Sequence, residues 1–134
     1  MTNILYTITS SKACTDAFNW LTENHIPFYE RRICKSSPLK QREILEILRL
    51  SENGFDDLLK RSIKTIEINE KQVTIENLST NELIKSIAKN PSILRTPILA
   101  NNRKMIIGFQ TSEMGVFVPK NVRRYEITKL LETS

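Results

Sequence analysis

The stretch that decides the fold is residues 3–33, which read NILYTITSSKACTDAFNWLTENHIPFYERRI. Residues 3–7 are β-branched and aromatic, which predicts a strand, and Thr9-Ser10-Ser11 are residue types that favour helix N-termini. Residues 12–24 then predict an amphipathic helix. Its apolar face carries Cys14, Ala17, Phe18 and Leu21. Residues 26–33 open with a proline and continue with aromatic side chains, a pattern typical of a second strand.

A strand, a helix and a strand within about 30 residues form a βαβ unit, in which the connection is right-handed and the strands are parallel. This order places the loop at residues 10–13 at the carboxyl end of the first strand. Proteins of the α/β class commonly build their functional sites at that edge. The sequence therefore predicts that a functional site of this fold lies at this loop and at the start of the helix that follows it.

The middle of the chain is predicted to be mostly helical. Ser37 is a candidate N-cap with Pro38 at the first helical position, and Asn53-Gly54 is expected to end that helix. A short helix is expected over residues 55–59. Residues 66–75 are ambiguous between irregular structure and a weak strand.

The last predicted elements complete a sheet. Ser79 and Glu82 form a capping box ahead of a helix that Asn90-Pro91 should stop. Residues 97–108, with a turn at Asn101-Asn102, predict a β-hairpin. Further on, residues 112–116 have helical tendency, Pro119 breaks it, and a charged tail follows.

Taken in order, these elements predict an α/β fold with a four-stranded mixed sheet, which is the thioredoxin-like arrangement. We expect one domain over residues 1–134, with a core formed by residues 1–36 and 93–120 and a helical insertion at 37–92. A chain of this length with 40% hydrophobic residues can fill one core.

Composition and charge exclude several classes of function. The net charge of +5 is scattered, with small clusters at Arg31/Arg32 and at Lys120/Arg123/Arg124, and no zinc-finger or basic-zipper signature is present. The two cysteines and the single histidine lack metal-ligand spacing, so neither a metal nor a cofactor is expected. We expect a cytoplasmic protein without a membrane association, because no signal-like segment or long apolar run occurs.

A series of segments spread along the chain points to a known family. They are Leu5-Tyr6-Thr7, Ile26-Pro27-Phe28, Ile47-Leu48-Arg49, Glu52-Asn53-Gly54, Arg61-Ser62, Leu94-Arg95-Thr96-Pro97-Ile98 and Ile107-Gly108-Phe109. In this order and spacing the sequence resembles the Spx branch of the arsenate-reductase-like (ArsC-like) family over residues 3–125. Each segment alone is a weak motif, whereas the series is specific.

The resemblance implies a regulator of transcription during stress rather than an enzyme. Spx-type proteins bind the C-terminal domain of the RNA polymerase α subunit, do not bind DNA independently, and are commonly cleared by a ClpXP-type protease. The resemblance places the polymerase contact at Gly54, with Arg49, Glu52 and Asn53 on the same surface. Taken without the family, Gly54 is a helix C-cap and Arg49 a solvated helix residue.

The redox motif of the family is broken in this chain. Redox-sensing members carry CxxC at the start of the first helix, where the helix N-terminus lowers a thiol pKa. The same window here is Ser11-Lys12-Ala13-Cys14, and the arginine that precedes the sheet proline in the family is Thr96. A serine cannot form a disulfide and, without an adjacent base, is a poor nucleophile. The disulfide switch and the reductase chemistry should therefore both be lost.

Three further interpretations of the sequence stay open. Cys14 is either a small buried apolar residue or the lone thiol of an arsenate reductase or glutaredoxin type oxidoreductase, and pairing with Cys34 is not expected. Lys120, Arg123 and Arg124 either touch promoter DNA indirectly or form a solvated tail. The chain could also compete with an intact family paralogue.

The resemblance implies a cis Pro97, and core packing is expected to account for most of the aromatic residues.

Overall fold

A computed structural model describes residues 3–108. In chain order its elements are β1 (Ile4–Ile8), α1 (Lys12–Glu23), β2 (Tyr29–Ile33), α2 (Gln41–Leu50), α3 (Phe55–Leu58), β3 (Thr65–Ile68), β4 (Lys71–Thr74), η1 (Ile75–Asn77), α4 (Thr80–Lys89), η2 (Pro91–Ile93), β5 (Ile98–Ala100) and β6 (Met105–Ile107). The predictions for residues 112–116, Pro119 and the cluster Lys120/Arg123/Arg124 lie outside the described residues. None of the helices between residues 3 and 108 is long and apolar enough to cross a membrane.

The central sheet has four strands in the order β2-β1-β5-β6. Strand β2 is parallel to β1, with Tyr6 opposite Arg31, whereas β5 is antiparallel to β1, with Tyr6 opposite Ile98. The hairpin of β5 and β6 closes the other edge. The predicted βαβ unit, terminal hairpin and mixed sheet are all confirmed. This register sets Thr96-Pro97, which has a cis peptide bond as expected, beside the carboxyl end of β1.

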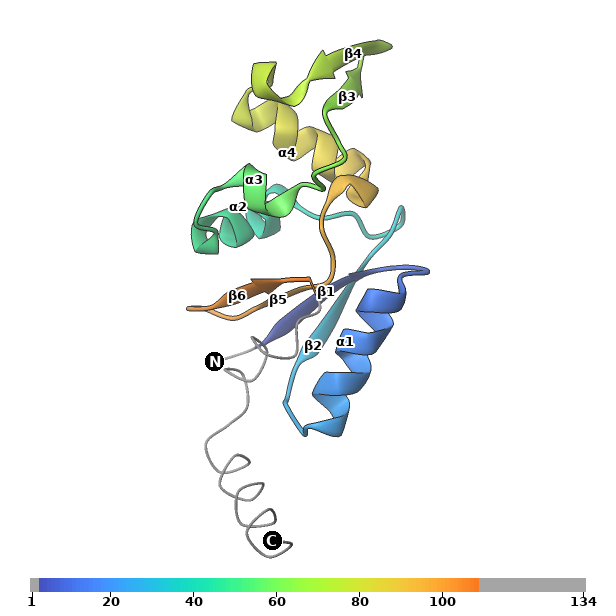
Figure 1. Cartoon of the computed structure of the whole chain (residues 1–134), viewed down its shortest axis with the longest axis vertical. Coiled ribbons are helices and arrows are strands. Elements are labelled where there is room, and N and C mark those ends of the chain that lie inside the picture. Colours follow the sequence, from blue (N-terminus) through green and yellow to red (C-terminus); the bar gives the residue numbers. More distant parts are fainter. Residues whose placement is uncertain (1–2, 109–134) are drawn as a thin grey trace, which may run out of the picture.

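Helices cover the two faces of the sheet unequally (Figure 1). Helix α1 packs on one face, and the segment from α2 to η2 lies over the other. Two groups of buried side chains correspond to these layers. The group under α1 comprises Leu5, Ala17, Leu21, Ile26, Leu99 and Ile106, and the larger group on the opposite face includes Tyr6, Ile44, Ile47, Leu58, Ile87, Leu94 and Ile98. Each such aliphatic side chain contributes about 1.5–3 kcal/mol when it is fully buried.

Helix α1 forms as the sequence predicts, with one exception on its apolar face. Ser11 is the N-cap and Asn24 the C-cap, and Cys14 is buried on the sheet side. Phe18, expected in the core, is 37% exposed and packs edge-on against Phe28 at the rim, with ring centroids 5.2 Å apart. Tyr29 also departs from the expectation of core packing, because it lies on the edge strand β2 and is 71% exposed.

The predicted start of the next helix is wrong by several residues. Helix α2 has Lys40 as its N-cap, and the Lys40 amide donates to Glu43 Oε1 at 3.0 Å. Ser37 instead pairs with Cys34 in an isolated bridge, and its carbonyl and hydroxyl oxygens accept bonds from the guanidinium of Arg31. A long-range contact from β2 therefore holds Ser37 outside the helix.

The ambiguous segment at residues 66–75 is a β-hairpin that forms a second, two-stranded sheet. Its turn residues Asn69 and Glu70 both have positive φ, at 52° and 66°, as a tight hairpin turn requires. Helix α4 begins with the predicted capping box, in which Ser79 and Glu82 exchange hydrogen bonds at 3.1 and 3.2 Å. It ends at Lys89, directly before Asn90-Pro91, as predicted.

Candidate functional site

The loop between β1 and α1 is a helix cap in this chain. The Ser11 hydroxyl accepts a hydrogen bond from the Cys14 amide at 3.3 Å, and the Ser11 carbonyl accepts one from the Thr15 amide at 3.1 Å. Cys14 is only 3% exposed, and it lines a small cavity beside the end of β1 together with Thr7 and Ser10. Ser11 therefore satisfies one of the free amides of the helix N-terminus.

The residues around the cis proline do not supply a cation to this loop. Thr96, where the family has arginine, stands beside the end of β1. Arg95 turns away toward α3: its amide donates to the Leu58 carbonyl at 2.7 Å and its Nη1 to the Asp57 carbonyl at 3.3 Å. Ser11, Cys14 and Thr96 thus lie at one edge of the sheet, while Arg95 points to a different site.

The second cysteine has different surroundings from the first. Cys34 follows the end of β2 and is partly exposed, and its sulfur lies 3.2 Å from Ser36 Oγ. The hydrogen bond with Ser36 is the largest effect lowering the pKa of Cys34. Cys14 and Cys34 are both free thiols in this structure. Among residues 3–108, no three potential ligand side chains are grouped so as to hold a metal ion.

The candidate partner-binding surface lies where α2 passes into α3. Gly54 has φ 63° and ψ −133°, which is a conformation open essentially to glycine, and it is the N-cap of α3. The C-cap interpretation of Gly54 is therefore wrong: α2 already ends at Leu50, with Ser51 as its C-cap. A Cβ atom on Gly54 would meet nothing within 4 Å. Backbone conformation, and not crowding, requires the glycine, and its free face is open.

Asp57 organises the turn and was missed by the sequence analysis. Its Oδ2 accepts hydrogen bonds from the amides of Glu52 and Asn53 at 3.1 and 2.9 Å, and its Oδ1 accepts one from Asn53 Nδ2 at 3.2 Å. The amide of Asn53 is the largest effect holding the pKa of Asp57 below its usual value. The signal for this role is an aspartate three residues after Gly54, in the first turn of a helix.

Arg49, from the last turn of α2, joins the same region to the β5–β6 turn. It pairs with Glu46 at 3.3 Å and donates from Nη2 to the Asn102 carbonyl at 3.2 Å. Arg49, Glu52 and Asn53 are all exposed, and Gly54 is half-buried. The structure brings these four residues onto one continuous segment, separate from Ser11 and Cys14. Arg95 connects the two places, because it precedes Thr96 and binds the carbonyl of Asp57.

Comparison with known proteins identifies the family. The ArsC family model matches residues 6–117. The chain belongs to the ArsC family. Among its relatives, this ArsC-family chain is 37% identical to the global transcriptional regulator Spx of Listeria innocua over 123 residues, covering 92% of each protein. It is 38% identical to the global transcriptional regulator Spx 1 of Bacillus cereus, with the same coverage.

Solved structures of low sequence identity share the fold of this ArsC-family chain. An ArsC family related protein from Bacteroides fragilis superposes with a TM-score of 0.67 at 20% identity, covering 87% of this chain and 99% of that one. An arsenate reductase related protein from Brucella melitensis gives 0.59 at 19% identity, covering 87% and 93%. The thioredoxin-like fold predicted from the order of elements is therefore confirmed.

Proposed function

We propose that this chain is a transcriptional regulator that binds the C-terminal domain of the RNA polymerase α subunit through the surface around Gly54, without a CxxC redox switch. The regulatory role is supported by relatives that are named global transcriptional regulators and that match 92% of the chain. The observation that carries the choice of surface is the open face of Gly54, where a side chain would meet no atom of the protein.

The turn has the properties of a preformed contact surface. Asp57 holds the backbone of Glu52 and both the backbone and the side chain of Asn53 by three hydrogen bonds, so this turn is ordered before a partner arrives. The bare backbone at Gly54 allows close approach, and the exposed Arg49, in the last turn of α2, offers a guanidinium to an acidic or carbonyl acceptor on the partner. Such an ordered, exposed segment is the kind of place where proteins bind.

Redox independence is supported by the loop at Ser11. Its hydroxyl caps α1, Cys14 is buried, and neither Cys14 nor Cys34 is in a disulfide. An oxidoreductase that uses Cys14 is the alternative that the ArsC family allows. It is less well supported, because a nucleophilic thiol must reach its substrate and Cys14 is only 3% exposed.

The test measures binding of the purified chain to the isolated α C-terminal domain by calorimetry. Gly54→Ala and Gly54→Arg share the backbone strain of a non-glycine residue at positive φ, and only the arginine adds bulk on the open face. We expect Gly54→Arg to abolish binding and Gly54→Ala to weaken it less. Thermal unfolding of both variants checks their folding. No binding by the wild type, or equal binding by all three, would contradict the proposal.

A second arm tests redox independence in a Cys34→Ser background, which removes the exposed thiol. The affinity of this variant for the α C-terminal domain should be the same in dithiothreitol and in diamide. A clear gain of affinity on oxidation would contradict the proposal.

Three finer statements belong to the same proposal. A regulator of this kind works beside RNA polymerase in the cytoplasm, and a ClpXP-type protease would set its abundance. Lys120, Arg123 and Arg124, outside the described residues, are proposed to contact promoter DNA phosphates once polymerase has positioned the chain. That contact predicts a salt-dependent contribution to promoter binding.

A further inference from the structure

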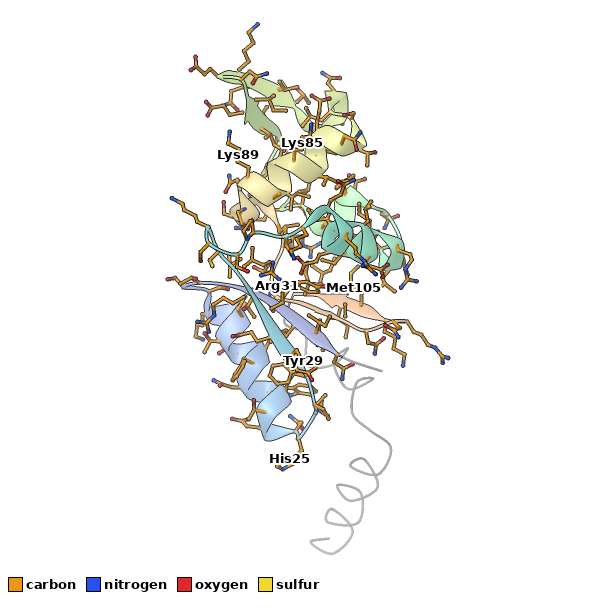
Figure 2. All side chains as sticks on the ribbon, turned by 180° about the vertical axis from the view of Figure 1, so that it is seen from behind. His25, Tyr29, Arg31, Lys85, Lys89 and Met105 are labelled. Carbon is orange, nitrogen blue, oxygen red and sulfur yellow. The ribbon has the colours of Figure 1, made fainter. Side chains whose placement is uncertain are left out.

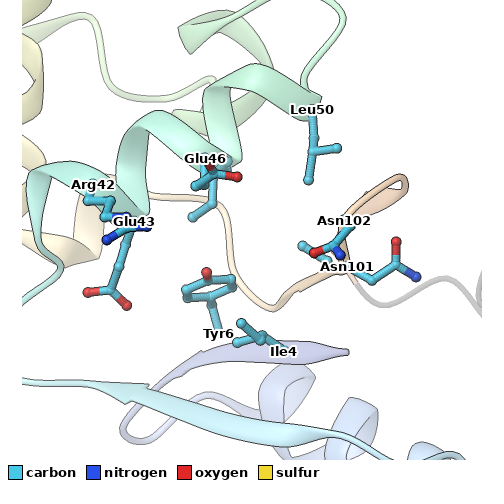
Figure 3. Close-up of a pocket in the computed structure, with 10 residues that line it drawn as sticks. Ile4, Tyr6, Arg42, Glu43, Glu46, Leu50, Asn101 and Asn102 are labelled. Atoms are coloured by element: carbon cyan, nitrogen blue, oxygen red, sulfur yellow. The ribbon is translucent and has the colours of Figure 1, made fainter. Parts of the chain in front are cut away.

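A cavity of about 240 Å³ lies between α2 and the sheet, at the amino end of β1 and thus away from the Ser11 loop. Its floor is apolar and comes from Ile4 and Ala100, which face each other across β1 and β5. Ile47 and Leu50 of α2 close the upper side. The close-up shows Tyr6 rising from β1 into this space beneath the helix (Figure 3).

The hydroxyl of Tyr6 is the unusual feature of the cavity. The residue is only 5% exposed, and among residues 3–108 its hydroxyl makes no hydrogen bond with another group. In Figure 3 the ring stands with its oxygen toward α2, between Glu43 and Leu50. Among residues 3–108 the fully buried side-chain oxygen without a partner is that of Thr7, whereas the Tyr6 hydroxyl is accessible from the cavity and can bond to a group that enters it.

The acceptor that the cavity offers beside this hydroxyl is a carboxylate oxygen, which suits a donor cation. Both carboxylate oxygens of Glu43 are already taken, by the guanidinium of Arg31 at 2.8 and 3.1 Å and by the Lys40 amide. Glu46 is different, because Arg49 reaches only its Oε2, at 3.3 and 3.4 Å. Its Oε1 accepts no bond from the described residues and is available.

The protonation state of Tyr6 is compatible with a cation in the cavity. Burial is the largest effect raising the pKa of Tyr6; the negative charges of Glu43 and Glu46 raise it further, and the positive charge of Arg31 lowers it. The phenol is neutral at physiological pH, and its oxygen can accept a hydrogen bond. Arg42 lines the cavity at the end nearest Glu43 (Figure 3). That end is the less suitable one for a cation.

We propose that this cavity binds a small organic cation, a primary amine carried on a compact apolar body of about one ring. The ammonium group donates to Glu46 Oε1 and to the Tyr6 oxygen, and the apolar body rests on Ile4, Ala100 and Leu50. The volume limits the body to this size, since it falls below the usual range for drug-sized ligands. The site does not depend on the polymerase-binding proposal.

The test titrates the ¹⁵N-labelled full chain with benzylamine, benzyl alcohol and benzoate, which share a ring and differ in head-group charge. Benzylamine should shift the amides of Ala100, Asn101 and Asn102 with a Kd of about 1 mM, as expected for so few atoms. Benzyl alcohol should bind more weakly and benzoate not at all.

Three variants sharpen the test. Tyr6→Phe and Glu46→Gln should each weaken benzylamine binding about two- to fivefold. Arg49→Gln, which removes the competing partner of Glu46, should strengthen it. Glu67→Gln, on β3 and outside the cavity, is the matched control and should change nothing. The absence of shifts with benzylamine, equal binding of the three probes, or a preference for benzoate would each overturn the proposal.

Discussion

Asp57 binds Asn53 twice, through its backbone amide at 2.9 Å and through its side-chain amide at 3.2 Å. These two bonds close the turn on which Gly54 adopts its glycine-specific conformation. The turn is also tied to the sheet, because Arg95, next to the cis proline, donates to the carbonyl of Asp57. Arg95, which precedes Thr96, therefore contacts α3 next to the candidate binding surface through both its amide and its side chain.

Replacing Asp57 with alanine should loosen the turn and weaken binding to the α C-terminal domain. Each lost hydrogen bond to a carboxylate is worth about 1.5–3 kcal/mol at most, and exposure reduces this, so we expect an affinity loss of about tenfold. Asp56→Ala is the matched control, since Asp56 is exposed and makes none of these bonds. Calorimetry measures the affinity of both variants for the α C-terminal domain. Equal affinities of Asp57→Ala and Asp56→Ala would show that the turn does not shape the binding surface.

The stability that Asp57 contributes should depend on pH. The folded-state pKa of Asp57 lies below its usual value, mainly because of the bond from the Asn53 amide. A lowered carboxyl pKa means stabilisation that is complete above the unfolded value, about 4, and is lost as the pH falls through the folded value. Urea unfolding should therefore show wild type more stable than Asp57→Asn at pH 7, with the difference shrinking below about pH 4. A constant difference across that range would contradict the assignment.

The two cysteines should react at very different rates. Cys34 is partly exposed and its pKa is lowered, chiefly by the hydrogen bond with Ser36, whereas Cys14 is 3% exposed. We expect a maleimide or disulfide reagent to modify Cys34 about tenfold faster or more in the folded chain. Mass spectrometry of Cys14→Ser and Cys34→Ser separates the two rates. Faster labelling of Cys14 would revive the oxidoreductase alternative.

Arg31 should be important for stability, and Arg32 should not. The Arg31 side chain, labelled in Figure 2, joins β2 to α2 and to the connection between them. It donates to both carboxylate oxygens of Glu43 and to the carbonyls of Ser37 and Pro38. Arg31→Ala should lower the free energy of unfolding by about 2–3 kcal/mol.

Arg32→Ala is the control for that prediction. Within residues 3–108, Arg32 forms an ion pair only with Glu30 at the surface, at 3.1 Å, and its loss should cost less than about 0.5 kcal/mol. Similar losses in the two variants would mean that the contacts of Arg31 with α2 contribute little.

The elements that the sequence predicted correctly are those with local signals. The βαβ unit, the capping box at Ser79 and Glu82 and the hairpin ending at Gly108 each depend on residues close together in the chain. The segment at 66–75 stayed ambiguous because its turn is Asn69-Glu70, which lacks the glycine that usually marks such turns.

The errors came from side-chain contacts, four to seven residues apart, that the residue types alone do not indicate. Ser37 and Pro38 resemble a helix start, but the guanidinium of Arg31 holds them in the connection before α2. Gly54 resembles a C-cap but is the N-cap of α3, where Asp57 accepts bonds from the amides of Glu52 and Asn53. The residues of the candidate surface could be named from the family resemblance, whereas Asp57, which shapes that surface, could not.

The most direct test of the central claim is to map the α-subunit contact on the chain itself. Adding unlabelled α C-terminal domain to the ¹⁵N-labelled chain should shift the amides of residues 49–57 first, with Gly54 and Asn53 among the largest changes. The loop at Ser11 should stay unshifted in both reducing and oxidising buffer. Shifts concentrated at Ser11 and Cys14, or none at Gly54, would contradict the account.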